Sequence, residues 1–132
     1  MEEMNNGVYL GQVPLADVPQ YVVLSDVVYY GLNASSPNNQ FSAPNALFAA
    51  LAAGKAVLTT SVGEIAQIVR EEDCGTILDT PSVQAIENTL GRLENRALLH
   101  QCKQNAMRAG RTKYNWDSVR RVLLSVYKEL AA

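Results

Sequence analysis

The segment from Phe41 to Thr60, FSAPNALFAALAAGKAVLTT, carries the clearest chemical signal in this chain. It predicts a loop, a helix that opens on Ser-Ala-Pro-Asn, a tight turn and a buried strand. A helix start of this kind presents free backbone N–H groups and the positive end of the helix dipole to an anion. No acidic residue lies between Asp26 and Glu64. The segment is therefore predicted to hold a phosphate group and to offer no carboxylate for catalysis.

Other reactive side chains form no recognisable catalytic set. His100 is the only histidine, and no Ser, Cys or Asp stands at an informative spacing from it. Cys74 and Cys102 are too few for a zinc site or a disulfide framework, and they predict two free thiols in a reducing cytoplasm. We therefore expect no catalytic residue, no metal site and no cofactor, and a cytoplasmic location.

Three familiar phosphate or phosphorylation motifs are absent or incomplete. The chain has no Gly-x-Gly-x-x-Gly, so a standard dinucleotide site is unsupported. Gly54-Lys55 resembles the end of a P-loop, but the next residue is Ala56 and the upstream glycine is missing. A phosphoacceptor domain would need paired acids after its first strand, whereas Asp26 precedes a strand.

The composition describes a globular domain with no electrostatic attraction to polyanions. The 132 residues suffice for one domain with its own core, and 48% are hydrophobic while 18% are charged. A net charge of -2 gives no reason to expect binding to nucleic acid or to an anionic membrane. Met1 to Asn6 is acidic and polar rather than a signal peptide, and no apolar run reaches the roughly 20 residues that a bilayer requires.

Short apolar strands alternate with helical stretches along the chain. This alternation predicts an α/β fold, with a doubly wound, mainly parallel four-stranded sheet, helices on both faces and a helical C-terminal section. The strands are expected at Val8 to Gly11, Asp26 to Gly31, Ala56 to Thr60 and Gly75 to Leu78. The helices are expected at Val18 to Ser25, Pro44 to Ala53, Glu64 to Glu72, Ser82 to Glu94, Arg96 to Ala109 and Trp116 to Leu130.

Two of these elements carry expectations of their own. The strand from Asp26 to Gly31 is almost wholly β-branched or aromatic, which predicts burial on both faces. The last helix repeats apolar residues at helical spacing, so it packs either on its own domain or on another domain or chain. Ligands of such sheets sit beyond the carboxyl ends of the strands, and the longest and most polar loop there is Gly31 to Asn45.

The order of short motifs resembles the donor-binding, C-terminal domain of a retaining GT-B-fold glycosyltransferase of the group 1 (family 4) type. The motifs are Gly11-Gln12-Val13, Ser25-Asp26-Val27, Ala43 to Phe48, Ala52 to Val57, Val62 to Ile65, Cys74-Gly75 and Tyr114 to Trp116. The resemblance implies a UDP- or GDP-linked sugar donor. It places the base and ribose beside Val13 and Leu15, and the diphosphate and sugar at the helix start.

The resemblance assigns binding roles residue by residue. The helix start would be supplied by Ser42, Ala43, Asn45, Ala46 and Leu47, with Ala49 at the position that grips the ribose. Departures from the family pattern fall on the same stretch. Two family glutamates align with Phe41 and Ala49, a phosphate-binding lysine of one branch aligns with Ala46, and the usual proline is Ala56. Each lost charged hydrogen bond costs roughly 1.5–3 kcal/mol of donor binding.

The resemblance covers only part of the family architecture. It implies a single domain over residues 1–132 that lacks the acceptor domain and the first two strand–helix units of the donor domain. We therefore expect a donor-domain fragment that is inactive alone, whose partners are the nucleotide sugar, an acceptor domain and a second copy of the chain in a homodimer. The alternative is a non-catalytic α/β module that serves as an interaction or regulatory subunit.

Overall fold

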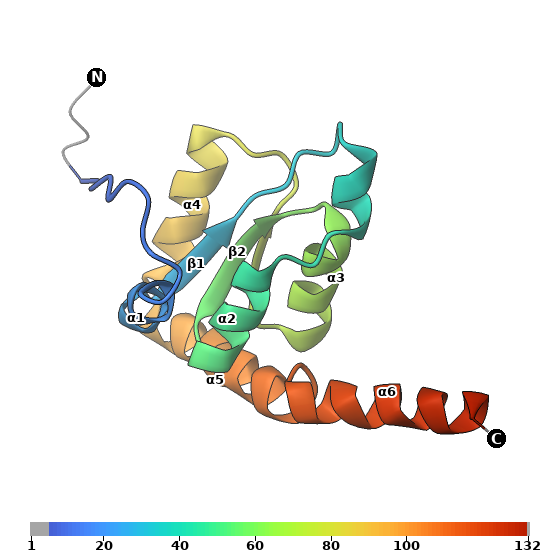
Figure 1. Ribbon diagram of the computed structural model, residues 1–132. Coiled ribbons are helices and arrows are strands. Elements are labelled where there is room, and N and C mark those ends of the chain that lie inside the picture. The colour runs from blue at the N-terminus through green and yellow to red at the C-terminus, as the bar shows by residue number, and fades with distance from the viewer. Residues whose placement is uncertain (1–5, 132) are drawn as a thin grey trace.

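The computed structural model describes residues 6–131, so Met1 to Asn5 of the polar opening lie outside the described residues. Helices and strands alternate as expected, and a helical section follows them (Figure 1). The elements are α1 (Val18–Leu24), β1 (Val27–Tyr30), the 3-10 helix η1 (Pro37–Phe41), α2 (Asn45–Ala53), β2 (Ala56–Thr60), α3 (Gly63–Glu72), β3 (Gly75–Leu78), α4 (Val83–Leu93), α5 (Arg96–Thr112) and α6 (Trp116–Leu130).

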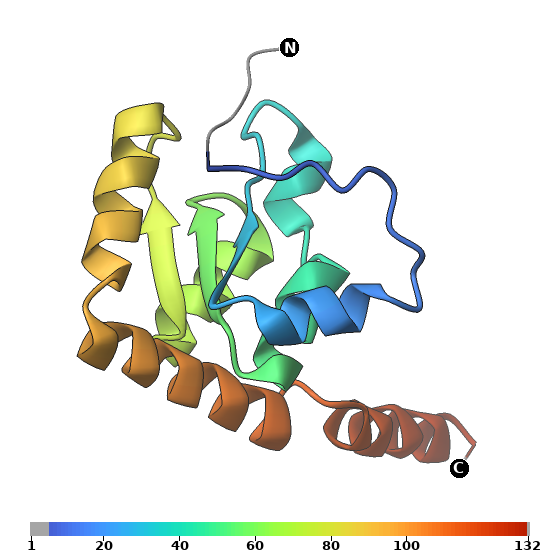
Figure 2. The same ribbon diagram turned by 90° about the vertical axis from the view of Figure 1, so that its left-hand side faces the viewer.

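The sheet is parallel and has three strands over residues 6–131, in the order β1-β2-β3. Val28 pairs with Val57, and Thr59 pairs with Ile77. Because consecutive strands are neighbours, right-handed crossovers place α2 and α3 on the same face of the sheet. Figures 1 and 2 show these two helices together on one side, and α4 beside β3. The sheet is thus one strand smaller than predicted, and a doubly wound arrangement is not confirmed.

The expected strand at Val8 to Gly11 is wrong. This stretch is irregular, the Val8 side chain is 84% exposed and Gly11 has a φ of 68°. A strand needs a neighbour that accepts and donates its backbone hydrogen bonds, and none of the described strands pairs with this stretch. Three apolar residues in a row were therefore not sufficient evidence for a strand.

Burial of β1 on both faces is also wrong. Val28 packs against the core, but Tyr29 is 51% exposed and Tyr30 is 38% exposed. Tyr29 stands on the face opposite to the core residue Val28, and α4 packs beside β3 rather than over this part of β1. β1 also stands at the edge of the sheet and pairs only with β2 within the described chain. The apolar sequence of β1 is typical of a central strand, but β1 is an edge strand of this sheet.

The core lies between the sheet and the helices on its covered face. Leu47 and Leu51 of α2 meet Val57 of β2 and the buried side of α3 in one cluster. Two glycines allow the closest approaches. A Cβ on Gly75 would overlap the Val57 backbone, and a Cβ on Gly110 would lie 2.7 Å from the Leu51 carbonyl oxygen. These contacts fix β3 against β2 and α5 against α2.

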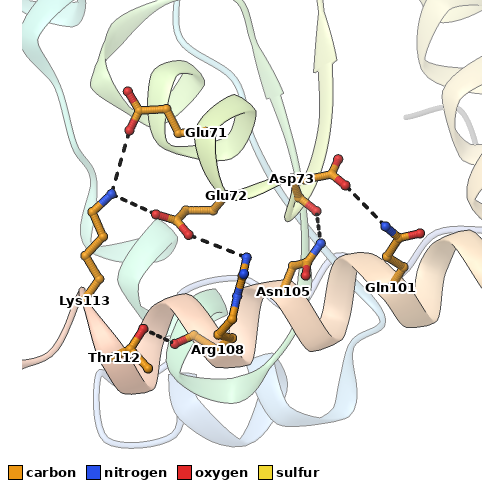
Figure 3. A network of polar contacts seen from close by, with 8 residues as sticks. All are labelled: Glu71, Glu72, Asp73, Gln101, Asn105, Arg108, Thr112 and Lys113. Carbon is orange, nitrogen blue, oxygen red and sulfur yellow. Dashed lines mark hydrogen bonds and ion pairs between the residues drawn. The ribbon is translucent and has the colours of Figure 1, made fainter.

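A polar network attaches α5 to the end of α3 (Figure 3). Asp73 ends α3 in the left-handed region with a φ of 48°, and the Asn105 side-chain amide donates to its carbonyl oxygen at 2.9 Å. Lys113 lies 2.8 Å from a Glu72 carboxylate oxygen, and the other carboxylate oxygen lies 3.8 Å from Arg108. The hydrogen bond to Glu72 raises the pKa of Lys113. These contacts hold α5 across the amino ends of the strands.

Helix α6 leaves the domain after the α5–α6 turn and projects away from it (Figure 1). None of its residues is buried. Its apolar side chains are exposed, and they comprise Trp116, Val119, Val122, Leu123, Leu124, Val126, Tyr127 and Leu130. The expectation that this helix packs on its own domain is therefore wrong.

Candidate functional site

The start of α2, which the sequence predicts to be a phosphate site, has no side-chain cap. Pro44 is the N-cap in an extended conformation, its carbonyl oxygen accepts from the Leu47 N–H at 2.9 Å, and no side chain caps the helix. The first-turn N–H groups of Asn45 and Ala46 therefore remain for an external acceptor, at the positive end of the helix dipole. Asn45 is exposed and Ala46 is half-buried.

Ser42 fixes the loop that leads into this helix. Its hydroxyl donates to the Asn38 carbonyl oxygen at 3.0 Å, and its own carbonyl oxygen accepts from the Ile65 N–H at 3.3 Å. The loop thereby caps the start of α3. Gly63 makes the approach possible, because a Cβ there would lie 2.6 Å from the Asn39 carbonyl oxygen. The half-buried Ser42 and Ala43 thus stand in a loop that tertiary contacts hold in place.

The other predicted site residues lie in different environments. Leu47 is 1% exposed and belongs to the core, so its side chain cannot touch a ligand. Ala49 lines an apolar hollow of about 350 Å³ between α2 and α1. Val13 is half-buried and Leu15 is 86% exposed in the segment before α1. No hydrogen bond among the described residues joins either of them to the start of α2.

A second hollow, of about 440 Å³, lies at the carboxyl ends of all three strands. The loop after β1 contributes Asn33, the loop after β2 contributes Ser61, and the loop after β3 contributes Asp79. The sequence predicts loops at these three places, but it gives no sign that their polar side chains meet. The signal that could have found them is the general rule that parallel strands deliver their following loops to one edge.

The shifted pKa values of the other ionisable groups, Asp26 and the two cysteines, follow from an ion pair and from burial. Asp26 lies 2.9 Å from Lys103 of α5, and the hydrogen bond from Lys103 lowers the pKa of Asp26. Cys74 and Cys102 are buried free thiols, and burial raises the pKa of Cys74 to about 12. Neither thiol is therefore a nucleophile at neutral pH.

Residues 6–131 contain neither a cluster of metal ligands nor a helix that could span a membrane. No group of three or more His, Cys, Asp or Glu residues there is arranged to hold a metal ion. No helix in the same range has the length and apolar character needed to cross a membrane.

The comparison with protein families gives one match. A family model described as group 1 glycosyl transferases matches residues 3–109. The matched range contains the whole sheet, the start of α2 and most of α5. No match is found among curated proteins.

Proposed function

Because this chain belongs to the group 1 glycosyltransferase family, we propose that it provides the donor-binding half of a retaining enzyme that moves a sugar from a UDP- or GDP-linked donor to an acceptor. The single observation that carries this proposal is the uncapped start of α2. The loop there is fixed by Ser42, and two first-turn N–H groups face outward from the helix end.

The proposed role of this site is electrostatic. The N–H groups of Asn45 and Ala46 would donate hydrogen bonds to the diphosphate and stabilise the negative charge that develops on it as the sugar leaves. Ser42 would hold the loop in place through the hydrogen bond from its hydroxyl to Asn38. Ala43 and the backbone of Leu47 complete the turn. In this proposal Val13 and Leu15 lie near the base and ribose, and the small Ala49 side chain leaves the ribose hydroxyls without a carboxylate partner.

We further propose that the chain needs an acceptor domain for activity and works in the cytoplasm. The absence of any carboxylate between Asp26 and Glu64 supports the need for a partner, because the site as it stands offers binding groups and no general acid or base. The two free thiols support a reducing compartment. The exposed faces of β1 and α6 support self-association into a homodimer.

An NMR titration with UDP and with GDP tests the donor site. If the proposal holds, the amide signals of residues 42–48 move together as nucleotide is added, and those of residues 13–15 move with them. Inorganic phosphate should move the first group alone, because it has no base or ribose. If neither nucleotide moves residues 42–48 at millimolar concentration, this chain has no donor site at the start of α2.

A further inference from the structure

The hollow at the carboxyl ends of the sheet is built from three loops. Figure 2 shows the three strands pointing the same way, so the loops that follow them meet at one edge. The lining includes Tyr29 and Asn33 from the β1 side, Ser61 after β2, and Asp79 and Pro81 after β3. This edge is distinct from the hollow against α1 that Ala49 lines.

Hydrogen bonds between neighbouring loops hold this hollow in shape. The Thr60 hydroxyl accepts from the Leu32 N–H at 2.9 Å and donates to the Leu32 carbonyl oxygen at 2.8 Å. On the other side, the Ser61 N–H donates to the Leu78 carbonyl oxygen at 3.0 Å. The loop after β2 is thus bonded both to the loop after β1 and to the end of β3, and the lining is formed before any ligand arrives.

An aromatic ring forms one wall. Tyr29 is 51% exposed and stands on the face of β1 opposite to the core residue Val28. Its side chain leans toward Gly31, because a Cβ on that glycine would lie 2.9 Å from the Tyr29 Cζ and still closer to the hydroxyl. The absence of a Cβ on Gly31 therefore leaves space for the tyrosine ring in the lining of the hollow.

Several polar groups of the lining are not used by the protein. The Asp79 carboxylate and the Tyr29 hydroxyl line the hollow and form no hydrogen bond or ion pair with another of the described residues. The Asn33 Oδ1 accepts from the Ser35 N–H at 2.9 Å, which leaves its amide NH₂ group as a donor. The hollow thus offers a carboxylate acceptor, an amide donor and a phenol that can do both.

The charge of the lining limits the class of ligand. Asp79 is the one charged residue among the lining residues, and none of them is basic. A phosphate or another anion is therefore repelled, whereas a neutral molecule with several hydroxyl groups satisfies donors and acceptors together. The face of an aromatic ring matches the C–H face of a pyranose.

We propose that this hollow binds a neutral sugar ring, with Tyr29 stacked on the ring and Asp79 and Asn33 bonded to its hydroxyl groups. This proposal is independent of nucleotide binding at the start of α2, because it uses different residues. The hollow carries the negative charge of Asp79, whereas the start of α2 is the positive end of a helix dipole. The sugar ring can be supplied by the acceptor or by the sugar part of the donor, and the experiment separates these two sources.

The test is an NMR titration of the full chain with maltose, with UDP-glucose, with UDP and with inorganic phosphate. We expect maltose to move the amides of residues 31–34, 61–62 and 79 with millimolar affinity, while phosphate leaves them in place. If maltose has no effect but UDP-glucose moves them and UDP does not, the sugar comes from the donor. If phosphate moves them as maltose does, or if neither sugar moves them, the proposal is wrong.

Three variants test the named groups. Asp79→Asn and Tyr29→Phe should each weaken sugar binding, the first by about tenfold because a charged hydrogen bond is lost. Gly31→Ala should weaken it as well, because the added Cβ displaces the tyrosine ring. Glu94→Gln is the matched control, because this exposed carboxylate follows α4 at the opposite end of the sheet. Equal affinity in Asp79→Asn and Glu94→Gln would overturn the assignment. UDP binding at residues 42–48 reports separately on the donor site.

Discussion

At the scale of single residues, the start of α2 shows which features of a site a local motif predicts and which it does not. The free N–H groups at Asn45 and Ala46 could be predicted because helix geometry alone leaves them unpaired. The burial of Leu47 follows from which side of α2 faces the sheet, and a helical pattern of nine residues rich in alanine leaves that side undefined. The meeting of Asn33, Ser61 and Asp79 depends on three separate loops, so no local pattern reveals it.

Replacement of Ala46 by lysine should strengthen nucleotide diphosphate binding. A cation in the first turn would add a charged contact to the phosphate, worth about 1–2 kcal/mol, which is a factor of roughly 5–30 in affinity. Calorimetry with UDP and GDP measures the change. Ala52→Lys, the same substitution in the last turn of the same helix, is the control and should leave the affinity unchanged. An equal gain in nucleotide affinity for the two variants would show that the added charge strengthens binding wherever it lies on α2. The start of α2 would then not be a phosphate site.

The buried thiol of Cys74 should make the chain less stable in alkali. Its pKa is raised from 9.0 to about 12 by burial, so its contribution is complete below pH 9 and is lost as the pH rises toward 12, when the unfolded thiol ionises. The loss from this group is at most about 1.4 kcal/mol per pH unit. Urea unfolding across this range should show the stability of Cys74→Ala approaching that of the unchanged protein. Val69→Ala, at a buried position without a proton to lose, should keep a constant difference, and a constant difference for Cys74→Ala would contradict the assignment.

At the scale of elements, strands β2 and β3 and helix α6 have the bounds that the sequence predicts, and α1, α2, α3 and α4 differ by a residue or so at an end. These elements are predictable because their signals are local, such as the Gly54 turn before β2 and the Ser82 cap whose hydroxyl oxygen accepts from the Ala85 N–H of α4. Strand pairing is not local. The stretch at Val8 resembles a strand and has no partner, and β1 resembles a central strand and lies at the edge.

Two glycines in helices should respond in opposite ways to alanine. A Cβ on Gly110 meets the Leu51 backbone at 2.7 Å, so Gly110→Ala should separate α5 from α2 and cost about 1–3 kcal/mol of unfolding free energy. A Cβ on Gly91 meets nothing within 4 Å, so Gly91→Ala should gain about 0.5–1 kcal/mol through helix propensity. Chemical denaturation of the pair gives both values. Stabilisation by both substitutions would mean that α5 does not approach α2 this closely.

At the scale of the whole molecule, the uncovered apolar face of α6 is the largest departure from a closed domain. If the proposed homodimer uses this face, Leu123→Glu should abolish it, because a carboxylate would be buried at the contact. Ser125→Glu, on the other side of the same helix, should leave it intact. Light scattering over a dilution series measures the association. Since α6 has no buried residue, both variants should unfold within about 0.5 kcal/mol of the unchanged protein.

The edge strand β1 is the competing contact surface, and the same series of variants decides between the two. A dimer that survives Leu123→Glu would place the contact at the exposed side of β1 instead, where backbone groups of Val27 to Tyr30 have no partner strand on one side among residues 6–131. A monomer for the unchanged protein at high micromolar concentration would contradict self-association through either surface.

The projection of α6 also has a consequence for the scattering of X-rays in solution. Its 15 residues make a rod about 22 Å long, attached at one end to a domain that is otherwise compact. A compact chain of this length would have a radius of gyration of about 14 Å, whereas a protruding rod places mass far from the centre and raises that value. The pair-distance distribution of the monomer should therefore carry an extended tail at long distances, and removal of residues 116–131 should leave the profile of a near-spherical particle.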